Sequence, residues 1–318
     1  MKKLLALIFL FLFTVSFFGC TQSNTDLTST STTTTENSDN FSVLVPAGAP
    51  ALAQVFMQDN SHYNVDVING PDPLVAAFTS NSYDFIFAPT NLGAKLYNMG
   101  IEYKFLAAIT FGNYYLVSNQ TSDFTIQSLE GKEITLFGQN ATSDIILQYI
   151  LNENDVHATL NYVDSVTSAN SIYIADDTKI IMTAEPSLSI LEDSVPGFKI
   201  IDLQEEYAKI TGEGSYPQAG VFGKVSLTDD QINQFLDDLE SSVIKVKGYP
   251  NQAIEKAIEF NYGFSETVLL SAIPNCHFDY INALDVRADL ETYFNIILNM
   301  NSALIGGTLP EDDFYYQS

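Results

Sequence analysis

VLVPAGAPALAQ, residues 43–54, leads from an apolar strand into a helix through a loop of proline, alanine and glycine. Between Pro46 and Ala51 no side chain is larger than proline, although the chain is rich in bulky residues. A loop of this composition exposes its backbone, and its two prolines restrict its conformations. Since the loop has no side chain that can act as an acid, base or nucleophile, we interpret it as backbone that a small molecule can contact closely.

Strands and helices alternate along the chain from residue 41 onward. The runs typical of strands are 42–45, 63–68, 83–88, 105–109 and 114–117. Helices are expected at 50–58, from Asp72 and from Pro89. This alternation is typical of a mainly parallel sheet with helices on both faces.

A second unit of the same kind follows the first. Its expected strands are 133–137, 160–163, 179–182 and 198–201, and its expected helices are 144–151 and 187–191. After residues 219–223 we expect helices alone, starting with the capping-box signature Thr228-x-x-Gln231 and continuing at 252–260 and 287–299. A chain that ends in helices after two such units can return to cover the first unit.

We therefore predict an α/β protein of two lobes. Residues 41–116 and 218–318 form the first lobe, with the helical C-terminal tail packed on it, and residues 117–217 form the second. About 280 residues of globular character suit two lobes better than one small core.

The first 20 residues, MKKLLALIFLFLFTVSFFGC, have the features of an export signal: Lys2 and Lys3, then an apolar segment, then Gly19-Cys20. Gly19-Cys20 resembles the end of a bacterial lipoprotein signal, in which lipidation of Cys20 would anchor the protein to the outer face of the cell membrane. Phe17 and Phe18 depart from the usual aliphatic and small residues at these places. An ordinary signal peptide or an uncleaved anchor is the alternative.

Residues 21–40 contain one large apolar residue, Leu27, among many Ser, Thr and Asn. Such a segment buries too little surface to offset its ordering entropy, so we expect a disordered tether. No later stretch is long and apolar enough to span a bilayer. The chain has two cysteines, and if Cys20 is lipidated then Cys276 has no disulfide partner.

The charge balance is strongly acidic, with 39 Asp and Glu against 13 Lys and Arg, a net charge of −26. A surface of this charge repels nucleic acid and anionic lipid headgroups, so nucleic acid is excluded as a partner. We interpret the acidity as a general property of the surface rather than as a dedicated cation site.

Four stretches, VLVPAGAPAL at 43–52, NGPDPLVAAF at 69–78, YDFIFAPTNLGAKLY at 83–97 and LPEDDFYY at 309–316, resemble a known family. Together with an export signal, a tether and two α/β units, they look like the substrate-binding lipoproteins of ABC importers. The resemblance is to the type II receptors of the nitrate/sulfonate/taurine and thiamine-precursor group. It extends over the mature chain at the level of architecture.

This resemblance implies a monomeric, non-enzymatic binding protein without cofactor or metal. Two lobes joined by crossing strands near 113–117 and 218–221 would close on a small polar organic molecule or anion and present it to a permease and ATPase complex. In such folds the ligand lies at the carboxyl ends of strands and faces helix N-termini, whose free N–H groups suit acceptor atoms. The candidate ligand-binding residues are Ala47, Gly48, Ala49, Thr90, Asn91, Asn113, Gly138, Gln139, Asn140, Thr142 and Glu185.

Glu185 is the charged member of this set. A carboxylate in the cleft would favour an amine or amidine on the ligand and oppose a bare nitrate or sulfate. The alternative is an acid that stabilises the start of a helix.

Two other classes of function remain open. The three histidines lie in different segments without metal-site spacing, and neither a Gly-x-Ser-x-Gly motif nor a phosphate-binding glycine loop occurs. Cys276-His277 could suggest a nucleophile and base, but residues adjacent in sequence rarely face each other in that way. An enzyme of small aromatic metabolite chemistry on the same fold is one alternative. A surface binding protein that senses a ligand without transport is the other.

Overall fold

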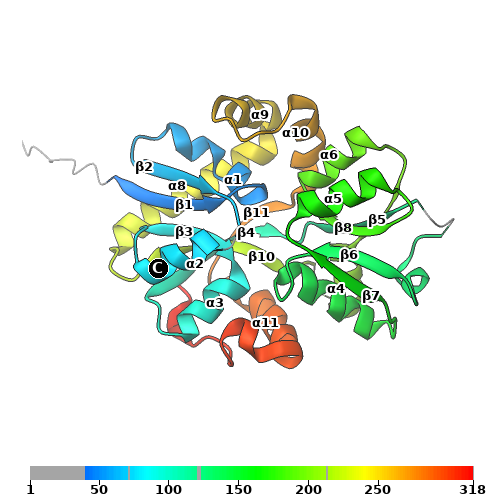
Figure 1. Cartoon of the computed structure of the whole chain (residues 1–318). Coiled ribbons are helices and arrows are strands. Elements are labelled where there is room, and N and C mark those ends of the chain that lie inside the picture. The colour runs from blue at the N-terminus through cyan, green and yellow to red at the C-terminus, as the bar shows by residue number, and fades with distance from the viewer. Residues whose placement is uncertain (1–39, 71, 120–122, 213, 318) are drawn as a thin grey trace, which may run out of the picture. The chain divides into compact units, whose positions relative to one another are not determined.

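The computed structural model describes residues 40–70, 72–119, 123–212 and 214–317. Residues 39–318 form a compact unit of two β-sheets with helices around them. Strands β1 to β4 gather at the left of Figure 1 and strands β5 to β8 at the right. The predicted lipidation site, Cys20, and the predicted tether lie outside the described residues, apart from Asn40 at the end of the tether.

The first sheet has the strand order β11-β4-β10-β3-β1-β2. Its strands are β1 (Phe41–Pro46), β2 (Tyr63–Ile68), β3 (Phe85–Pro89), β4 (Tyr103–Phe111), β10 (Pro217–Lys224) and β11 (Phe278–Asn282). Strand β1 pairs in parallel with β2 and β3, whereas β10 pairs antiparallel with β3 and β4, and β11 antiparallel with β4.

The second sheet has the strand order β7-β6-β8-β5-β9. Its strands are β5 (Tyr114–Ser118), β6 (Glu133–Phe137), β7 (Thr159–Val163), β8 (Ile180–Ala184) and β9 (Lys199–Asp202). Strand β6 pairs in parallel with β7 and β8, and β5 pairs antiparallel with β8 and β9.

Helices precede and follow these strands. With the first sheet go α1 (Ala49–Ala53), η1 (Val55–Asp59), α2 (Asp72–Ser80), α3 (Thr90–Asn98), α8 (Asp229–Gly248), α9 (Pro250–Glu259), α10 (Glu266–Ala272), η3 (Ile273–Asn275), α11 (Arg287–Asn301), η4 (Ser302–Ile305) and η5 (Asp312–Phe314). With the second go η2 (Ile126–Leu129), α4 (Thr142–Glu153), α5 (Val166–Ala175), α6 (Ser187–Ser194) and α7 (Leu203–Thr211). Helix α10 contacts α6, and α11 contacts α4, so elements of the two sets also touch away from the strands.

The predicted fold class, α/β with two sheets flanked by helices, is confirmed, but the strand pairing is more mixed than the sequence pattern predicted. The chain leaves the first sheet after β4 and returns to it as β10, which inserts antiparallel between β3 and β4. The expectation that strands stop after residue 223 was wrong. Strand β11 lies at the edge of the sheet, and its short sequence FDYIN gives little periodicity to detect.

Close packing of α3 on β10 depends on Gly93. A Cβ atom at this position would lie 2.0 Å from the ring of Phe222, which is far inside van der Waals contact. The Phe222 ring also packs edge-on against Phe78, with 5.5 Å between ring centroids. Deeper in the same core, Phe85 and Phe235 stack with centroids 3.7 Å apart, which joins β3 to α8. Aromatic burial of this kind stabilises the described part of the chain, in which Cys276 is a free thiol.

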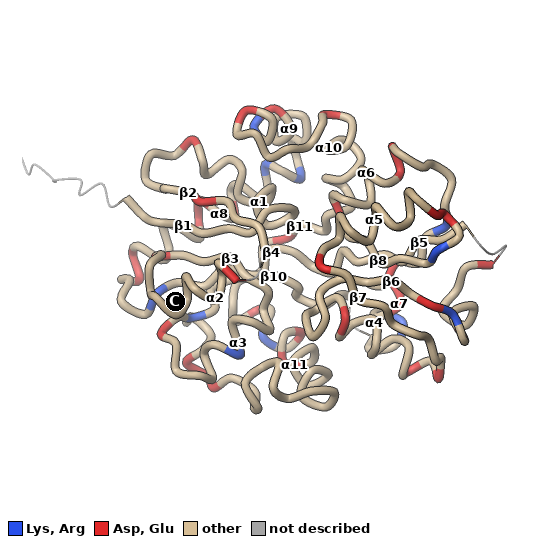
Figure 2. The backbone as a smooth tube through the Cα atoms, viewed as in Figure 1, with Lys and Arg blue, Asp and Glu red and all other residues tan. Residues whose placement is uncertain are grey.

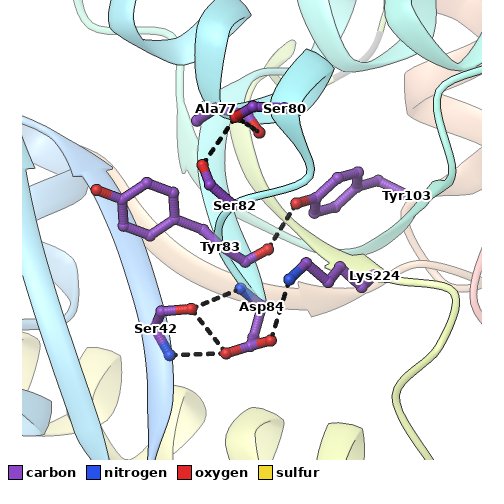
Figure 3. A network of polar contacts seen from close by, with 8 residues as sticks. All are labelled: Ser42, Ala77, Ser80, Ser82, Tyr83, Asp84, Tyr103 and Lys224. Carbon is purple, nitrogen blue, oxygen red and sulfur yellow. Dashed lines mark hydrogen bonds and ion pairs between the residues drawn. The ribbon is translucent and has the colours of Figure 1, made fainter.

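A polar network fixes one edge of the first sheet, where β1 and β3 begin and β10 ends (Figure 3). Asp84 Oδ2 accepts hydrogen bonds from the backbone N–H of Ser42 at 2.8 Å and from its hydroxyl at 2.7 Å. Asp84 Oδ1 pairs with Lys224 Nζ at 3.3 Å. Asp84 therefore joins β1, β3 and β10 at the end of the sheet where β1 and β3 begin.

The environment of Asp84 also shifts its pKa. Burial alone would raise the pKa of this carboxyl, but the hydrogen bonds from Ser42 and the ion pair with Lys224 outweigh burial and hold it below 3.8. The pKa of Asp84 is lower in the folded state than in the unfolded chain. The carboxylate therefore stabilises the fold at pH values above its unfolded-state pKa, and this contribution is lost as the pH falls through its folded-state pKa.

We expect Asp84→Asn to lower the free energy of unfolding by about 2 kcal/mol at pH 7, because a charged acceptor of several hydrogen bonds is lost. Urea denaturation measures this change. Asp279→Asn is the control, since Asp279 forms an exposed ion pair with Lys247 and should contribute less than about 1 kcal/mol. Equal losses in the two variants would contradict the role given to Asp84.

Candidate functional site

A cavity of about 370 Å³ lies between the two sheets, where several strands end and helices begin. Strand β1 ends there before α1, β6 ends at Phe137, and β8 ends before α6. The cavity is lined by Ala47, Gly48, Ala49, Pro50, Asn69, Asn113, Tyr114, Phe137, Val166, Thr167, Ala184, Glu185, Pro186, Ser187, Ile190, Gln218 and Phe264. Carboxyl ends of strands are where ligands bind in open α/β sheets, so this cavity is the candidate binding site.

A larger hollow of about 560 Å³ lies elsewhere, beside Tyr103, Val225 and Thr308. Tyr103 begins β4 and Val225 follows the last residue of β10. Its lining comes from the first sheet, the end of α3 with the loop after it, and the C-terminal segment, without strand ends of the second sheet. The smaller cavity is therefore the better candidate.

The two segments that cross between the sheets are bonded to each other at the floor of the cavity. Gly112 N–H donates to Tyr216 O at 3.2 Å, and Asn113 N–H donates to Gln218 Oε1 at 3.2 Å. Gly112 permits this approach, because a Cβ atom there would lie 2.4 Å from Tyr216 Cζ. His277 adds a third segment, with its Nδ1 2.6 Å from Gly112 O.

Asn113 also bonds to the end of β8. Its side-chain Nδ2 donates to Glu185 O at 3.3 Å, and its backbone O accepts from Glu185 N at 3.4 Å. Asn113 is 3% exposed. Within the described part of the chain, its Oδ1 has no hydrogen-bond partner. The lining residue Asn113 thus has a buried acceptor atom that no described residue satisfies.

Glu185 is the buried carboxylate of the cavity, with 5% of its surface exposed. The backbone N–H of Ser189 donates to its Oε2 at 3.2 Å, and the Ser189 hydroxyl to its Oε1 at 3.1 Å. Burial raises the pKa of Glu185 to about 7, since the bonds from Ser189 offset desolvation only in part and Glu192 adds repulsion. The carboxyl group is therefore poised between its two protonation states near neutral pH.

Aromatic rings form another part of the lining, from Tyr114, Phe137 and Phe264. The rings of Tyr114 and Phe137 meet edge to face, with centroids 6.0 Å apart. Tyr114 is buried, and desolvation raises the pKa of its hydroxyl, which stays neutral. These rings suit an organic ligand with apolar surface or a cationic group.

Five of the predicted ligand-binding residues line the cavity: Ala47, Gly48, Ala49, Asn113 and Glu185. Gly48 has φ 103° and ψ −146°, a conformation that only glycine adopts readily, so the glycine is required by the turn itself. No atom beyond its chain neighbours lies within 4 Å of the place where a Cβ would stand, which leaves its backbone accessible.

Thr90, Asn91 and Thr142 do not line the cavity. Thr90 Oγ1 donates to Pro217 O at 2.7 Å, and Thr142 Oγ1 donates to Asn91 Oδ1 at 3.2 Å. All three side chains are buried. Their polar groups bond to one another and to the backbone, and the Thr142–Asn91 bond joins α4 to α3.

Gly138, Gln139 and Asn140 do not line the cavity either. They form the turn before α4, in which Gly138 and Asn140 have positive φ and Asn140 N–H donates to Asp144 Oδ2 at 2.8 Å. The conformational demands of this turn explain its small and amide residues.

Sequence reasoning missed several lining residues. Asn69 follows the predicted strand 63–68 and could have been found by the same strand-end argument that selected Ala47. Val166 and Thr167 begin α5, a helix that was not predicted because its sequence, VTSANSIYIA, has weak periodicity. Phe264 precedes α10 and reaches the cavity from the C-terminal part, and no local signal marks it.

Cys276 and His277 do not form a nucleophile and base. Cys276 is a buried free thiol whose pKa is raised well above its ordinary value by burial and by nearby Glu185. The His277 ring bonds to Gly112 O. Within the described residues, no group of three or more His, Cys, Asp or Glu could hold a metal ion, and no helix is both long and apolar enough to cross a bilayer.

No protein-family profile matches the chain, and a search of curated proteins gives no match. Solved structures do match. An ABC transporter from Parabacteroides distasonis superposes with a TM-score of 0.78 at 22% identity, covering 88% of this chain and 99% of that one. The chain has the type II periplasmic-binding-protein fold.

Other structures with this fold are binding components of transport systems. The periplasmic aliphatic sulphonate-binding protein SsuA from Escherichia coli has a TM-score of 0.69 at 12% identity, over 88% of this chain and 92% of that one. The ligand-binding component of an ABC-type import system from Staphylococcus aureus, with zinc bound, has a TM-score of 0.67 at 12% identity, over 87% and 96%. At these identities the comparison establishes the fold alone.

The raised pKa of Glu185 makes stability depend on pH in a predictable direction. The protonated carboxyl stabilises the empty protein fully below pH 4.5, and this contribution is lost as pH rises through about 7. We expect the ligand-free Glu185→Gln variant to be more stable than the wild type at pH 8, by up to about 3 kcal/mol, and equally stable at pH 4.5.

Urea denaturation of both proteins across this pH range measures the difference. Asp193→Asn on the same helix is the control, because Asp193 is exposed and the change also removes one negative charge. A pH dependence that is unaltered in Glu185→Gln would show that burial does not perturb Glu185.

Proposed function

We propose that this protein is the extracytoplasmic solute-binding component of an ABC importer, which binds a small polar organic molecule in the cavity between its sheets. The observation that carries this proposal is the cavity itself, formed at strand ends of both sheets in a fold shared with binding components of importers. A volume of about 370 Å³ suits one small solute.

Two lobes, 41–116 with 218–318 and 117–217, would close on the solute by rotation about the crossing segments and deliver it to a permease. The interlocked hydrogen bonds of Gly112 and Asn113 make these segments suitable hinges, since short segments at element ends absorb such motions. The protein would act as a monomer without enzymatic activity, anchored through lipid on Cys20 to the outer face of the cell membrane and tethered by residues 21–40.

Binding is tested by differential scanning fluorimetry of the purified protein against a solute panel that includes taurine, alkylsulfonates, nitrate, aminopyrimidines and amines. A specific solute should raise the melting temperature. At a hundred times its Kd, binding adds about 2.7 kcal/mol to the free energy of unfolding. Deletion of the gene should abolish uptake of that solute. Binding with normal uptake would favour the ligand-sensing function, and turnover of a compound would favour an enzyme.

The position of the solute is tested with Val166→Trp. Val166 begins α5 and lines the cavity, so the larger ring should occupy the space and weaken binding at least tenfold, or about 1.4 kcal/mol. Ile174→Trp is the matched control, because Ile174 lies on the same helix, is 50% exposed and does not line the cavity. Isothermal titration calorimetry measures both, and equal affinities would exclude this cavity as the site.

The anchor is tested by replacing each of the two cysteines in turn. Cys20→Ser should abolish labelling by radioactive palmitate and release the protein from the membrane fraction. Cys276→Ser should keep both the label and the membrane fraction, because Cys276 is buried in the globular unit. Unchanged labelling of Cys20→Ser would refute lipidation at that residue.

A further inference from the structure

The cavity has a negative group without a positive counterpart. Among the described residues that line it, none is Lys, Arg or His. Glu185 takes part in no ion pair within the described part of the chain, although it is 95% buried. Buried carboxylates are ordinarily paired or kept protonated, so the charged form of Glu185 has hydrogen-bond donors in Ser189 but no oppositely charged partner among the described residues.

Asn113, which bonds to Glu185, provides a further hydrogen-bond acceptor near this carboxylate. Asn113 Oδ1 is buried and accepts no hydrogen bond from the described residues. Its other side-chain atom, Nδ2, is already engaged with Glu185 O. A ligand with N–H donors would offset the charge of Glu185 and bond to Asn113, whereas a ligand with acceptors alone would do neither.

The two longer helix N-termini beside the cavity, which could attract an anion, each have one backbone N–H group already engaged. At the start of α6, the backbone N–H of Ser189 donates to Glu185 itself. The start of α5 is capped by the hydroxyl of Ser165, which accepts from Ser168 N–H. Helix α1 has one turn and so little dipole to offer. An anion would therefore meet one uncompensated carboxylate and no charge of opposite sign.

The surroundings of Glu185 point the same way. The titratable groups that interact electrostatically with Glu185 are Glu192 on α6, Tyr115 on β5 and Cys276 after η3. All are neutral or acidic. Figure 2 shows acidic residues spread along the whole trace with few basic ones between them, so the wider field also favours a cation.

We propose that the solute carries a protonated nitrogen, as an amine or amidine, that binds the Glu185 carboxylate and donates to Asn113 Oδ1. The aromatic rings of Tyr114, Phe137 and Phe264 lie along the same cavity and suit the organic part of such a cation. This inference rests on the proposed function and names the substrate class of that site.

A ligand with a protonated nitrogen binds the ionised form of the Glu185 carboxylate. The affinity for such a ligand should therefore depend on pH. With a pKa of about 7, Glu185 is mostly protonated at pH 5.5 and mostly ionised at pH 8.5. Affinity for a ligand that stays protonated across this range should rise about 30-fold between the two. An anion that accepts a hydrogen bond from the protonated carboxyl would show the opposite trend.

The experiment uses two sets of probe compounds. Every compound has a single benzene ring, and the members of a set differ mainly in the charge of the attached group. Benzamidine is compared with neutral benzamide and anionic benzoate, and 2-phenylethylamine with neutral 2-phenylethanol. Calorimetry on the purified wild type should give at least tenfold tighter binding of the cation in one of the sets. Glu185→Gln should reduce that preference below about threefold and remove the pH dependence, while Asp193→Asn at an exposed position of α6 should keep both.

Tighter binding of benzoate or of a neutral member would overturn the inference and leave the proposed function intact. A cation preference that survives Glu185→Gln would overturn it as well. Absence of binding by every probe at millimolar concentration would also count against a cation site. In that case the wider solute panel tests the proposed function separately. Binding of a sulfonate or nitrate from that panel would support the proposed function.

Discussion

The hydrogen bonds of Asn113 hold together the segments that form the cavity. Its backbone N–H bonds to Gln218 in the returning segment, and its backbone O and side-chain Nδ2 bond to Glu185 at the end of β8. The two crossings and the charged residue of the cavity are thereby fixed relative to one another. Gly112, immediately before, leaves space for the Tyr216 ring, so the arrangement also requires a residue without a side chain at that point.

The position of Glu185 has an energetic consequence. Its charged form is buried without a cation in the described residues, which costs stability near neutral pH, and the bonds from Ser189 offset only part of that cost. Residues that bind ligands often lower the stability of the empty protein in this way. A group that pairs with the ligand has no such partner in the protein when the ligand is absent. The two interpretations of Glu185, a helix cap and a ligand contact, are therefore compatible. One carboxylate caps α6 and still lacks a charge partner.

The fold was predictable because its signals are local. Hydrophobic runs such as 83–88 and cap residues such as Thr228 report on single elements, and the structure contains both. Strand β11 and helix α5 were missed because their short or weakly periodic sequences do not differ from loops. The pairing of β10 between β3 and β4 is a long-range fact that no window of sequence contains.

The cavity was predictable only in part, for a related reason. Strand ends could be found from sequence, and Ala47 and Glu185 came from that argument. Which strand ends face one cavity depends on how the sheets meet. The turn 138–140 has the same composition as a binding loop, yet its small residues serve its own backbone conformation. Phe264 lies in the cavity through the return of the C-terminal part, which composition does not encode.

The two sides of the cavity are held by contacts of different kinds, and this bears on closure. On one side, the bond between Thr142 and Asn91 joins α4 to α3 in a fully buried setting. On the other, α10 contacts α6, and both Phe264 and Ile190 line the cavity there. A single neutral hydrogen bond contributes about 1 kcal/mol, and a solute that pairs with Glu185 can exceed this. If the proposed solute binds there, its pairing with Glu185 adds to these contacts and further opposes separation of the sheets.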